Sequence, residues 1–110
     1  MEKLSQDEVL RIVRELHQHL NAVYGGRLKG VYLYGSYARG DARDDSDIDV
    51  AVVLDGEVNR WNERKKIREI VTDLCLKENC LILTMPLSDQ EFKERPYDFH
   101  TNLAAEGIPV

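Results

Sequence analysis

The N-terminal part of the chain has apolar residues three and four positions apart, a spacing that gathers side chains on one face of an α-helix. These apolar positions are Val9, Ile12, Val13, Leu16, Leu20 and Val23. Ser5 precedes Glu8 by three residues, the spacing of a capping box, in which each side chain bonds the backbone N–H of the other residue. Gly25 and Gly26 follow and are expected to end the helix. The pattern predicts a helix over about residues 5–24.

Three β-rich runs follow the first helix. The first, Leu28–Tyr34, is short, and the second, Asp47–Leu54, is apolar at every position beyond Asp49. A continuous apolar run is typical of a strand that is covered on both faces of its sheet. The third run, Leu81–Met85, is expected to end before Pro86. We therefore expect the second run to be a central strand with its acidic residues at one end.

Helical segments separate and follow these strands. Ile67, Ile70, Val71, Leu74 and Cys75 share one helical face and predict an amphipathic helix over about residues 59–78. Ser88 and Glu91 have the spacing of a helix cap, Pro96 interrupts, and a last helical stretch is expected to run to Gly107. This order of helices and strands predicts an α/β (α+β) fold, a small mixed sheet packed with helices.

Length and composition are consistent with one small domain over residues 1–110. A chain of 110 residues that is 43% hydrophobic can form one core and has no room for a second domain. No apolar run reaches the roughly 18 residues that a membrane span requires, and the N-terminus lacks the order of a secretory signal. We expect a cytoplasmic protein without membrane contact. The net charge of −5 argues against direct binding of long nucleic acid, which draws on many cations.

The cysteines and histidines do not form a metal-binding pattern. Cys75 is expected on a helix face and Cys80 at a strand start, and neither has the C-x-x-C spacing of a zinc site. His17 and His19 are two residues apart on a predicted helix, so their side chains point to different faces. We expect these two histidines and His100 to be exposed or to have ordinary hydrogen-bond partners.

Charged residues are concentrated in two places. One predicted helix carries the cations Arg60, Arg64, Lys65, Lys66 and Arg68. This cluster is most simply a solvated helix face, with a share in triphosphate or partner binding left open. Residues 41–49 carry five aspartates, which favour a nearby cation. Three aromatic residues look exposed and are open candidates for a partner surface: Trp61, Tyr97 and Phe99.

The acidic end of the second strand follows a Gly-Ser turn. Gly35 permits a close approach of the backbone, so the turn can bring N–H groups against a phosphate. Asp47 and Asp49 are two residues apart, so a strand places both carboxylates on one face, within reach of one hard cation such as Mg²⁺. A phosphate cradle beside a metal site indicates phosphoryl or nucleotidyl transfer.

Ten residues separate Ser36 from Asp47, and this G-S-x10-D-x-D arrangement resembles the signature of the polymerase-β-like nucleotidyltransferases. The chain is most similar to their minimal branch, the MNT domain, specifically over residues 31–54 and more loosely over most of the rest. The resemblance implies that Asp47 and Asp49 are the catalytic, Mg²⁺-binding carboxylates. It also implies that Ser36, next to Gly35, offers its hydroxyl and N–H to the β- and γ-phosphates of ATP. Arg39 contacts phosphate on this view, with a salt bridge to Asp41 or Asp45 as the alternative.

One feature of the superfamily is missing. Polymerase-β-like enzymes usually add a third carboxylate from a later strand, which helps to activate the attacking hydroxyl. The corresponding run here, Cys80–Met85, contains no acid, and Glu78 just before it is expected to end a helix in solvent. Nucleotide and Mg²⁺ binding are therefore better supported than turnover, and slow transfer is expected.

Three functions remain open at this point. MNT domains resemble the antitoxins of HEPN/MNT modules, which implies AMP transfer from ATP to a tyrosine of a HEPN-type ribonuclease toxin encoded nearby. A non-catalytic antitoxin or assembly subunit is the alternative, because the third carboxylate is missing. A small-molecule nucleotidyltransferase of the aminoglycoside type is the third, and it normally needs additional substrate-binding elements.

Overall fold

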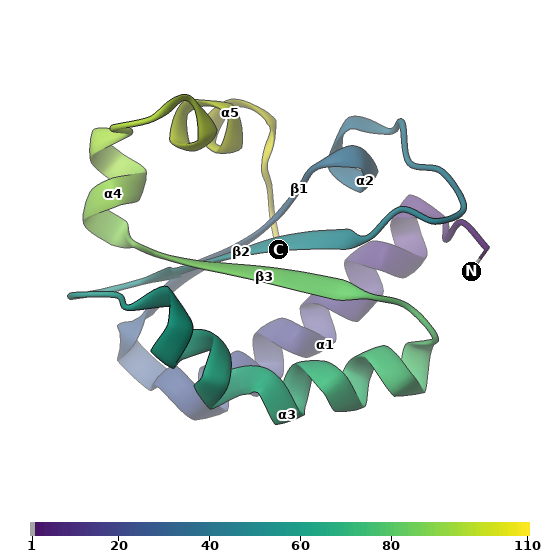
Figure 1. Cartoon of the computed structure of the whole chain (residues 1–110), viewed down its shortest axis with the longest axis horizontal. Helices are drawn as coiled ribbons and strands as arrows, with labels where there is room; N and C mark the ends of the chain where they lie inside the picture. The colour runs from purple at the N-terminus through teal and green to yellow at the C-terminus, as the bar shows by residue number, and fades with distance from the viewer. Residues whose placement is uncertain (1) are drawn as a thin grey trace.

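The computed structural model describes residues 2–110 and contains one four-stranded sheet with the strand order β3-β2-β1-β4 (Figure 1). β1 (Leu28–Tyr34) runs antiparallel to both β2 (Ile48–Leu54) and β4 (Ile108–Pro109). β2 runs parallel to β3 (Ile82–Ser88). The mixed α/β architecture confirms the predicted fold class, and β2 is an interior strand as expected.

The helices cover both faces of this sheet. α1 and α3 lie on one face, α4 and α5 cover part of the other, and the short α2 lies between β1 and β2 in the chain (Figure 1). The helix bounds are α1 Gln6–Tyr24, α2 Ser36–Arg39, α3 Arg60–Glu78, α4 Asp89–Glu94 and α5 Asp98–Glu106, with a 3-10 turn η1 at Gly25–Arg27. Across residues 2–110, no helix has both the length and the apolar content needed to cross a membrane.

The start of α1 has the predicted capping box and also holds α2 in place. The backbone N–H of Glu8 donates to Ser5 Oγ at 3.1 Å, and the N–H of Ser5 donates to Glu8 Oε1 at 3.3 Å. Leu4 N–H donates to the Tyr37 hydroxyl at 3.2 Å, and Gln6 Nε2 donates to the Tyr37 carbonyl at 3.1 Å. These bonds attach α2, which follows β1, to the start of α1.

β2 is buried on both faces and separates two apolar clusters. Val50, Val52 and Leu54 pack toward α1 and α3, whereas Ala51 and Val53 pack toward α4 and α5. This two-sided burial explains the continuous apolar run in the sequence. Asp49 lies on the same face as Ala51 and Val53, because alternate residues of a strand share a face. The acidic end of the strand is therefore on the α5 side of the sheet.

The third strand differs from the sequence prediction. It spans Ile82–Ser88 and continues through Pro86, whereas Leu81–Met85 was predicted. β3 is an edge strand, and the carbonyl of Thr84 accepts a bond from Arg64 Nε at 3.0 Å on its open side. Pro86 is two residues further along, so its nitrogen faces the same open side, where no neighbouring strand needs an N–H donor. The prediction was wrong because it treated the proline as a break.

The histidines mostly follow the expectation, whereas Cys80 does not. His17 Nδ1 lies 2.7 Å from the carbonyl oxygen of the last residue, and His19 is exposed. His100 is buried with Nε2 at 3.2 Å from Glu91 Oε2, and its Nδ1 has no partner among residues 2–110. Cys80 precedes β3 by two residues, so its prediction as a strand start was wrong, and burial raises the pKa of its thiol to about 11.

A buried ionic network, which the sequence did not suggest, connects the end of α1 to α3. The Glu63 side chain is buried and accepts bonds from Arg27 Nη1 at 2.9 Å and from the Tyr24 hydroxyl at 3.1 Å. Arg27 also donates to the carbonyls of Asp55 at 2.9 Å and Glu57 at 2.7 Å. Burial raises the pKa of the Tyr24 hydroxyl, and the Glu63 carboxylate raises it further.

We expect Arg27→Ala to lower the free energy of unfolding by about 2–4 kcal/mol, because the buried Glu63 carboxylate loses its closer cation and keeps only Lys66, at 3.6 Å. Chemical denaturation monitored by circular dichroism measures this change. Arg14→Ala, an exposed arginine of α1, is the matched control and should stay within about 0.5 kcal/mol of the parent. Equal stability of the two variants would contradict the importance of the network.

Candidate active site

The site begins at a sharp turn after β1. Gly35 has φ 74° and ψ −156°, a backbone region that is essentially restricted to glycine. The N–H groups of Ala38 and Arg39 each donate to the Gly35 carbonyl at 3.1 Å, which closes the first turn of α2. Gly40 ends α2 in a left-handed conformation with φ 83°. Two glycines thus place Ser36 at the point where the chain leaves the sheet.

Gly35 also lies directly against Asp49. Tyr34 and Asp49 are cross-strand partners of the antiparallel pair β1–β2, so the turn lies next to the start of β2. A Cβ atom at Gly35 would collide with Asp49 Oδ2 and would lie 3.0 Å from its Cγ. Glycine is therefore required here for space as well as for backbone conformation.

The two predicted carboxylates lie together at the start of β2. Asp47 immediately precedes the strand, Asp49 is its second residue, and both are partly buried. Burial raises the pKa of the Asp49 carboxyl, the Asp47 charge raises it further, and Arg39 opposes both effects. Bringing two carboxylates together in this way costs free energy that a bound cation offsets.

The donor set fits Mg²⁺ bound together with a nucleotide. Among residues 2–110, no group of three or more His, Cys, Asp or Glu side chains forms a complete metal site. Asp47 and Asp49 alone would hold the ion. Mg²⁺ typically takes one or two carboxylates from the protein and completes its six positions with phosphate oxygens and water. Two carboxylates beside a glycine turn that can bind phosphate meet that requirement.

Arg39 lies at the mouth of the site and is already paired there. Its Nε donates to Asp41 Oδ2 at 3.3 Å, and its Nη1 lies 3.8 Å from Glu106 Oε2. The predicted salt bridge to Asp41 is thus present, and the same guanidinium is close enough to affect the pKa of Asp49. Both pairs are half-exposed and therefore weak, so an entering phosphate can compete for the arginine.

A cavity of about 380 Å³ lies between the Gly35 turn, Asp49 and α5, and Asp47 is not among the residues that line it. One wall consists of Tyr34, Gly35, Ser36, Arg39 and Asp49, and the other consists of Phe99, Asn102, Leu103 and Glu106. The sequence motif predicts the residues of the first wall except for Tyr34, and none of the second wall. The α5 residues lie fifty or more positions after Asp49 and have no distinctive spacing. Only the packing of α5 over the sheet brings them to the site.

Phe99 does not belong to the exposed surface that the sequence suggested. Its ring meets the Tyr34 ring edge to face, with the centroids 5.5 Å apart at an interplanar angle of 81°. Trp61 and Tyr97, in contrast, are 68% and 73% exposed, as expected. Phe99 therefore joins the cavity wall to the end of β1.

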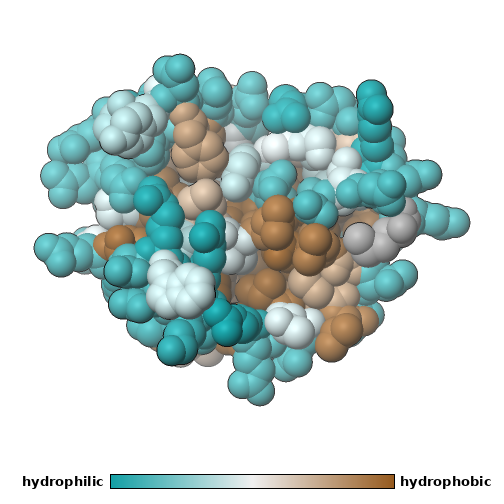
Figure 2. Space-filling view, in the orientation of Figure 1, coloured by the Kyte–Doolittle hydropathy of each residue, from teal (hydrophilic) through white to brown (hydrophobic). Residues whose placement is uncertain are grey.

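The position next to Asp49 on β3 is occupied by a leucine. Leu83 is the register partner of Asp49 in the parallel pair β2–β3 and is 46% exposed on the same face. Leu81, just before β3, is also exposed, and Figure 2 shows apolar side chains gathered around the middle of the face on which Figure 1 draws β3. The third carboxylate of the superfamily is therefore absent from β3, as the sequence indicated.

Glu78 does not replace the missing carboxylate. Its two oxygens accept bonds from Arg11 at 2.9 and 3.1 Å, and its side chain is only 12% exposed. Glu78 is the last residue of α3, as expected, but its side chain is paired with Arg11 and is not free in solvent. The bidentate pair with Arg11 lowers the pKa of the Glu78 carboxyl, so the carboxylate stays ionised and bound to Arg11.

The basic cluster of α3 is largely tied to the protein itself. Arg60 pairs with Glu91 at 2.9 Å, Lys66 with Glu63 at 3.6 Å, and Arg64 donates to a β3 carbonyl. These contacts favour a structural role for the cluster over a phosphate-binding one.

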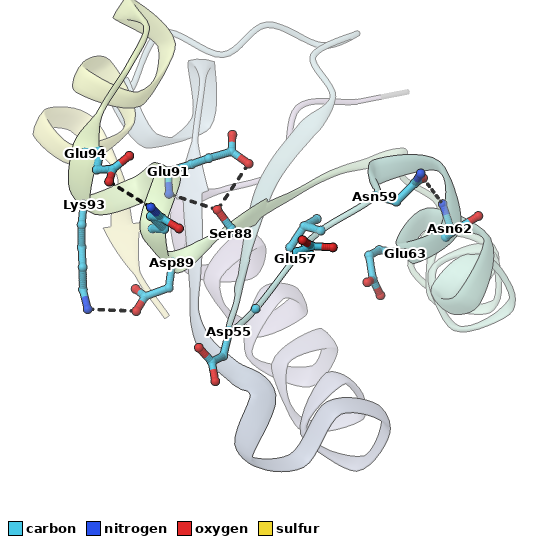
Figure 3. Close-up of a pocket in the computed structure, with 13 residues that line it drawn as sticks. Asp55, Glu57, Asn59, Asn62, Glu63, Ser88, Asp89, Glu91, Lys93 and Glu94 are labelled. Atoms are coloured by element: carbon cyan, nitrogen blue, oxygen red, sulfur yellow. Dashed lines mark hydrogen bonds and ion pairs between the residues drawn. The ribbon is translucent and has the colours of Figure 1, made fainter.

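A larger pocket of about 1080 Å³ lies at the opposite ends of β2 and β3, and its chemistry is unsuited to a triphosphate (Figure 3). Its acidic residues are Asp55, Glu57, Glu63, Asp89, Glu91 and Glu94. Lys93, the one cation among the lining residues of this pocket, is paired with Asp89 at 3.0 Å. An anionic ligand would meet net repulsion there. The smaller cavity beside Asp49 is therefore the candidate active site.

Comparisons with known proteins show the family of this chain. Residues 7–106 match the Nucleotidyltransferase domain family. The chain is 33% identical over 98 residues to "Putative protein adenylyltransferase MJ0604" of Methanocaldococcus jannaschii, covering 88% of this chain and 92% of that protein.

Two solved structures share the fold. A structure described as a putative nucleotidyltransferase from Sulfolobus solfataricus superimposes with a TM-score of 0.68 at 24% identity, covering 94% of this chain and 80% of that one. A toxin–antitoxin structure with AMP-PNP gives a TM-score of 0.54 at 20% identity, covering 96% and 72% of the two chains. The family match over nearly the whole chain, together with the Gly35 turn packed on Asp49, identifies this protein as a nucleotidyltransferase, a member of the Nucleotidyltransferase domain family.

Proposed function

We propose that this nucleotidyltransferase transfers AMP from ATP to a tyrosine of a HEPN-type ribonuclease toxin and so acts as the antitoxin of that toxin. The observation that carries the proposal is the close packing of the Gly35 turn on Asp49, whose carboxyl is also close enough to Asp47 for the Asp47 charge to raise its pKa. Similarity to a protein named as a protein adenylyltransferase supports a protein acceptor. The shared fold with a toxin–antitoxin structure solved with AMP-PNP is consistent with the partner and the nucleotide.

The reaction joins the tyrosine oxygen to the α-phosphorus of ATP. The bond between the α-phosphorus and the bridging oxygen breaks, pyrophosphate leaves, and the tyrosine proton passes to water. Mg²⁺, when bound, would neutralise charge on the phosphate oxygens. Asp47 and Asp49 would hold it, Ser36 would donate to the β- and γ-phosphates, and Arg39 would exchange its pair with Asp41 for phosphate. These residues position the reacting atoms and stabilise developing charge.

The tyrosine proton has no dedicated acceptor on β3, because Leu83 is the register partner of Asp49 and β3 contains no acidic residue. General-base catalysis is worth about 10²–10⁴-fold, so its absence predicts slow transfer rather than none. The same observation favours a second candidate, an antitoxin that binds nucleotide and neutralises its partner by binding alone.

Intact-mass analysis of the HEPN-type protein encoded beside this chain separates these two functions. The partner is incubated with this protein, ATP and Mg²⁺, and a parallel sample lacks ATP. We expect a mass gain of one or more AMP units only in the complete mixture. A stable complex of the two proteins with no mass gain after long incubation would establish the binding antitoxin instead.

Leu83→Asp tests the explanation of slow transfer. The variant places a carboxylate beside Asp49, and we expect the transfer rate to rise by about tenfold or more. Leu76→Asp introduces the same charge at an exposed leucine of α3, which is not part of the cavity lining, and should leave the rate unchanged. The AMP-modified fraction of the partner, followed over time by mass, measures both. A rate equal to the parent in Leu83→Asp would show that proton removal does not limit transfer.

A further inference from the structure

The cavity beside Asp49 has two chemically different walls. The β1–α2 wall offers a glycine turn, a hydroxyl, a guanidinium and the Asp49 carboxylate, which suit a metal-bound triphosphate. The α5 wall offers an aromatic ring, an amide, a leucine and a carboxylate. A triphosphate held by the first wall leaves the second for the remainder of the nucleotide.

Contacts with the sheet and with α2 hold the α5 wall in place, so that it can present a surface to a base. Leu103 is buried against β2, and the ring of Phe99 is held edge to face by Tyr34 on one side and by His100 on the other, each at 5.5 Å. Glu106, at the end of α5, reaches back to Arg39 across the cavity mouth. The helix is therefore fixed to the sheet at its start and middle and contacts α2 at its end.

Asn102 supplies the amide group of this wall. Its side chain lines the cavity, is exposed, and makes no hydrogen bond within residues 2–110. An amide both donates and accepts, and this pair matches the edge of adenine, where a ring nitrogen accepts and the exocyclic amine donates. Phe99, one helical turn earlier, supplies an apolar ring beside that position.

We infer that α5 forms the nucleoside-binding wall of this enzyme, with Asn102 as the residue that selects adenine and Phe99 as the apolar surface for the base. The inference rests on the proposed nucleotide-dependent function and adds to it the part of the chain that recognises the base. Asn102 then determines specificity and has no part in holding the phosphates.

Titration calorimetry with three probes in Mg²⁺ tests this assignment: ATP, GTP and inorganic tripolyphosphate. Tripolyphosphate carries the phosphates without a nucleoside, so it reports on the first wall alone. We expect Asn102→Ala to weaken ATP by about tenfold and to leave tripolyphosphate within twofold of the parent. Ser36→Ala should weaken both by a similar factor. Thr101→Ala, at the neighbouring exposed position outside the cavity lining, is the matched control and should change neither.

The other possible results contradict either the nucleoside-binding wall or the proposed function. An Asn102→Ala protein that binds ATP as the parent does, or that loses ATP and tripolyphosphate equally, overturns the nucleoside wall while the proposed function stands. A parent that binds GTP as tightly as ATP overturns the selection of adenine by Asn102. A parent that binds none of the three probes in Mg²⁺ overturns the proposed function, and the inference with it.

Discussion

Replacing Asp47 and Asp49 together by Asn should abolish Mg²⁺-dependent ATP binding and lower AMP transfer by about 10³-fold or more. The two carboxylates are the acidic groups that the structure places at the Gly35 turn, and the charge stabilisation supplied by a bound metal is worth several kcal/mol. Calorimetric titration with ATP, with and without Mg²⁺, measures the first effect, and partner mass analysis measures the second.

Stability separates this loss from misfolding. The folded-state pKa of Asp49 is raised, so the ionised group costs stability at neutral pH, and that cost disappears as the pH falls below its ordinary pKa. The protein with Asn at positions 47 and 49 has no such ionised group and therefore does not lose this stability. It should therefore unfold at the same or a higher temperature than the parent near pH 7, with the difference shrinking in acid.

The charge-matched control replaces Asp44 and Asp45 by Asn in the loop before the site. Asp44 accepts a hydrogen bond from the backbone N–H of Lys3 at 3.3 Å, which gives this segment a role in holding the loop. ATP binding by the control should therefore keep its Mg²⁺ dependence. Metal-dependent binding that survives in the Asp47 and Asp49 substitutions, or disappears in the control, would contradict the assignment of the metal site.

Gly35→Ala should weaken Mg²⁺-dependent ATP binding by more than about tenfold, because the added methyl group would occupy the space of the Asp49 carboxylate. The carboxylate or the turn must then move, and either movement separates the phosphate cradle from the metal ligand. A positive φ at a residue with a side chain also costs about 1–3 kcal/mol of stability. ATP titration and thermal unfolding measure the two effects separately.

Gly40→Ala provides the matched control for backbone strain. Gly40 also has a positive φ, at 83°, but a Cβ atom there has no neighbouring atom within 4 Å. This variant should therefore lose stability and keep its affinity for ATP. Equal ATP affinities in the two variants would show that the contact between Gly35 and Asp49 is not needed for nucleotide binding.

The sequence predicted those parts of the fold that depend on local pattern. The capping box at Ser5, the limits of α1 and α3 and the interior position of β2 agree with the structure to within a residue or two. These features follow from spacing along the chain, which fixes which side chains share a helix or strand face. The end of β3 was predicted wrongly because a proline is tolerated on the open side of an edge strand, and sheet position is not a local property.

The candidate site divides in the same way. The sequence by itself determined the turn and carboxylate half, because Gly35, Ser36, Asp47 and Asp49 lie within fifteen residues and chain geometry restricts how they can meet. Only the tertiary structure placed Leu83 beside Asp49, since the register of two parallel strands depends on the packing of the whole sheet.

The α5 half of the cavity was likewise decided by tertiary structure alone. Asn102 and Phe99 lie about fifty residues beyond Asp49, and no spacing rule relates them to it. They reach the cavity because Leu103 is buried against the α5-side face of β2, which fixes the rotation of the helix. The residues expected to bind the phosphates thus belong to one local motif. The α5 surface expected to contact the base forms only when the hydrophobic core has formed.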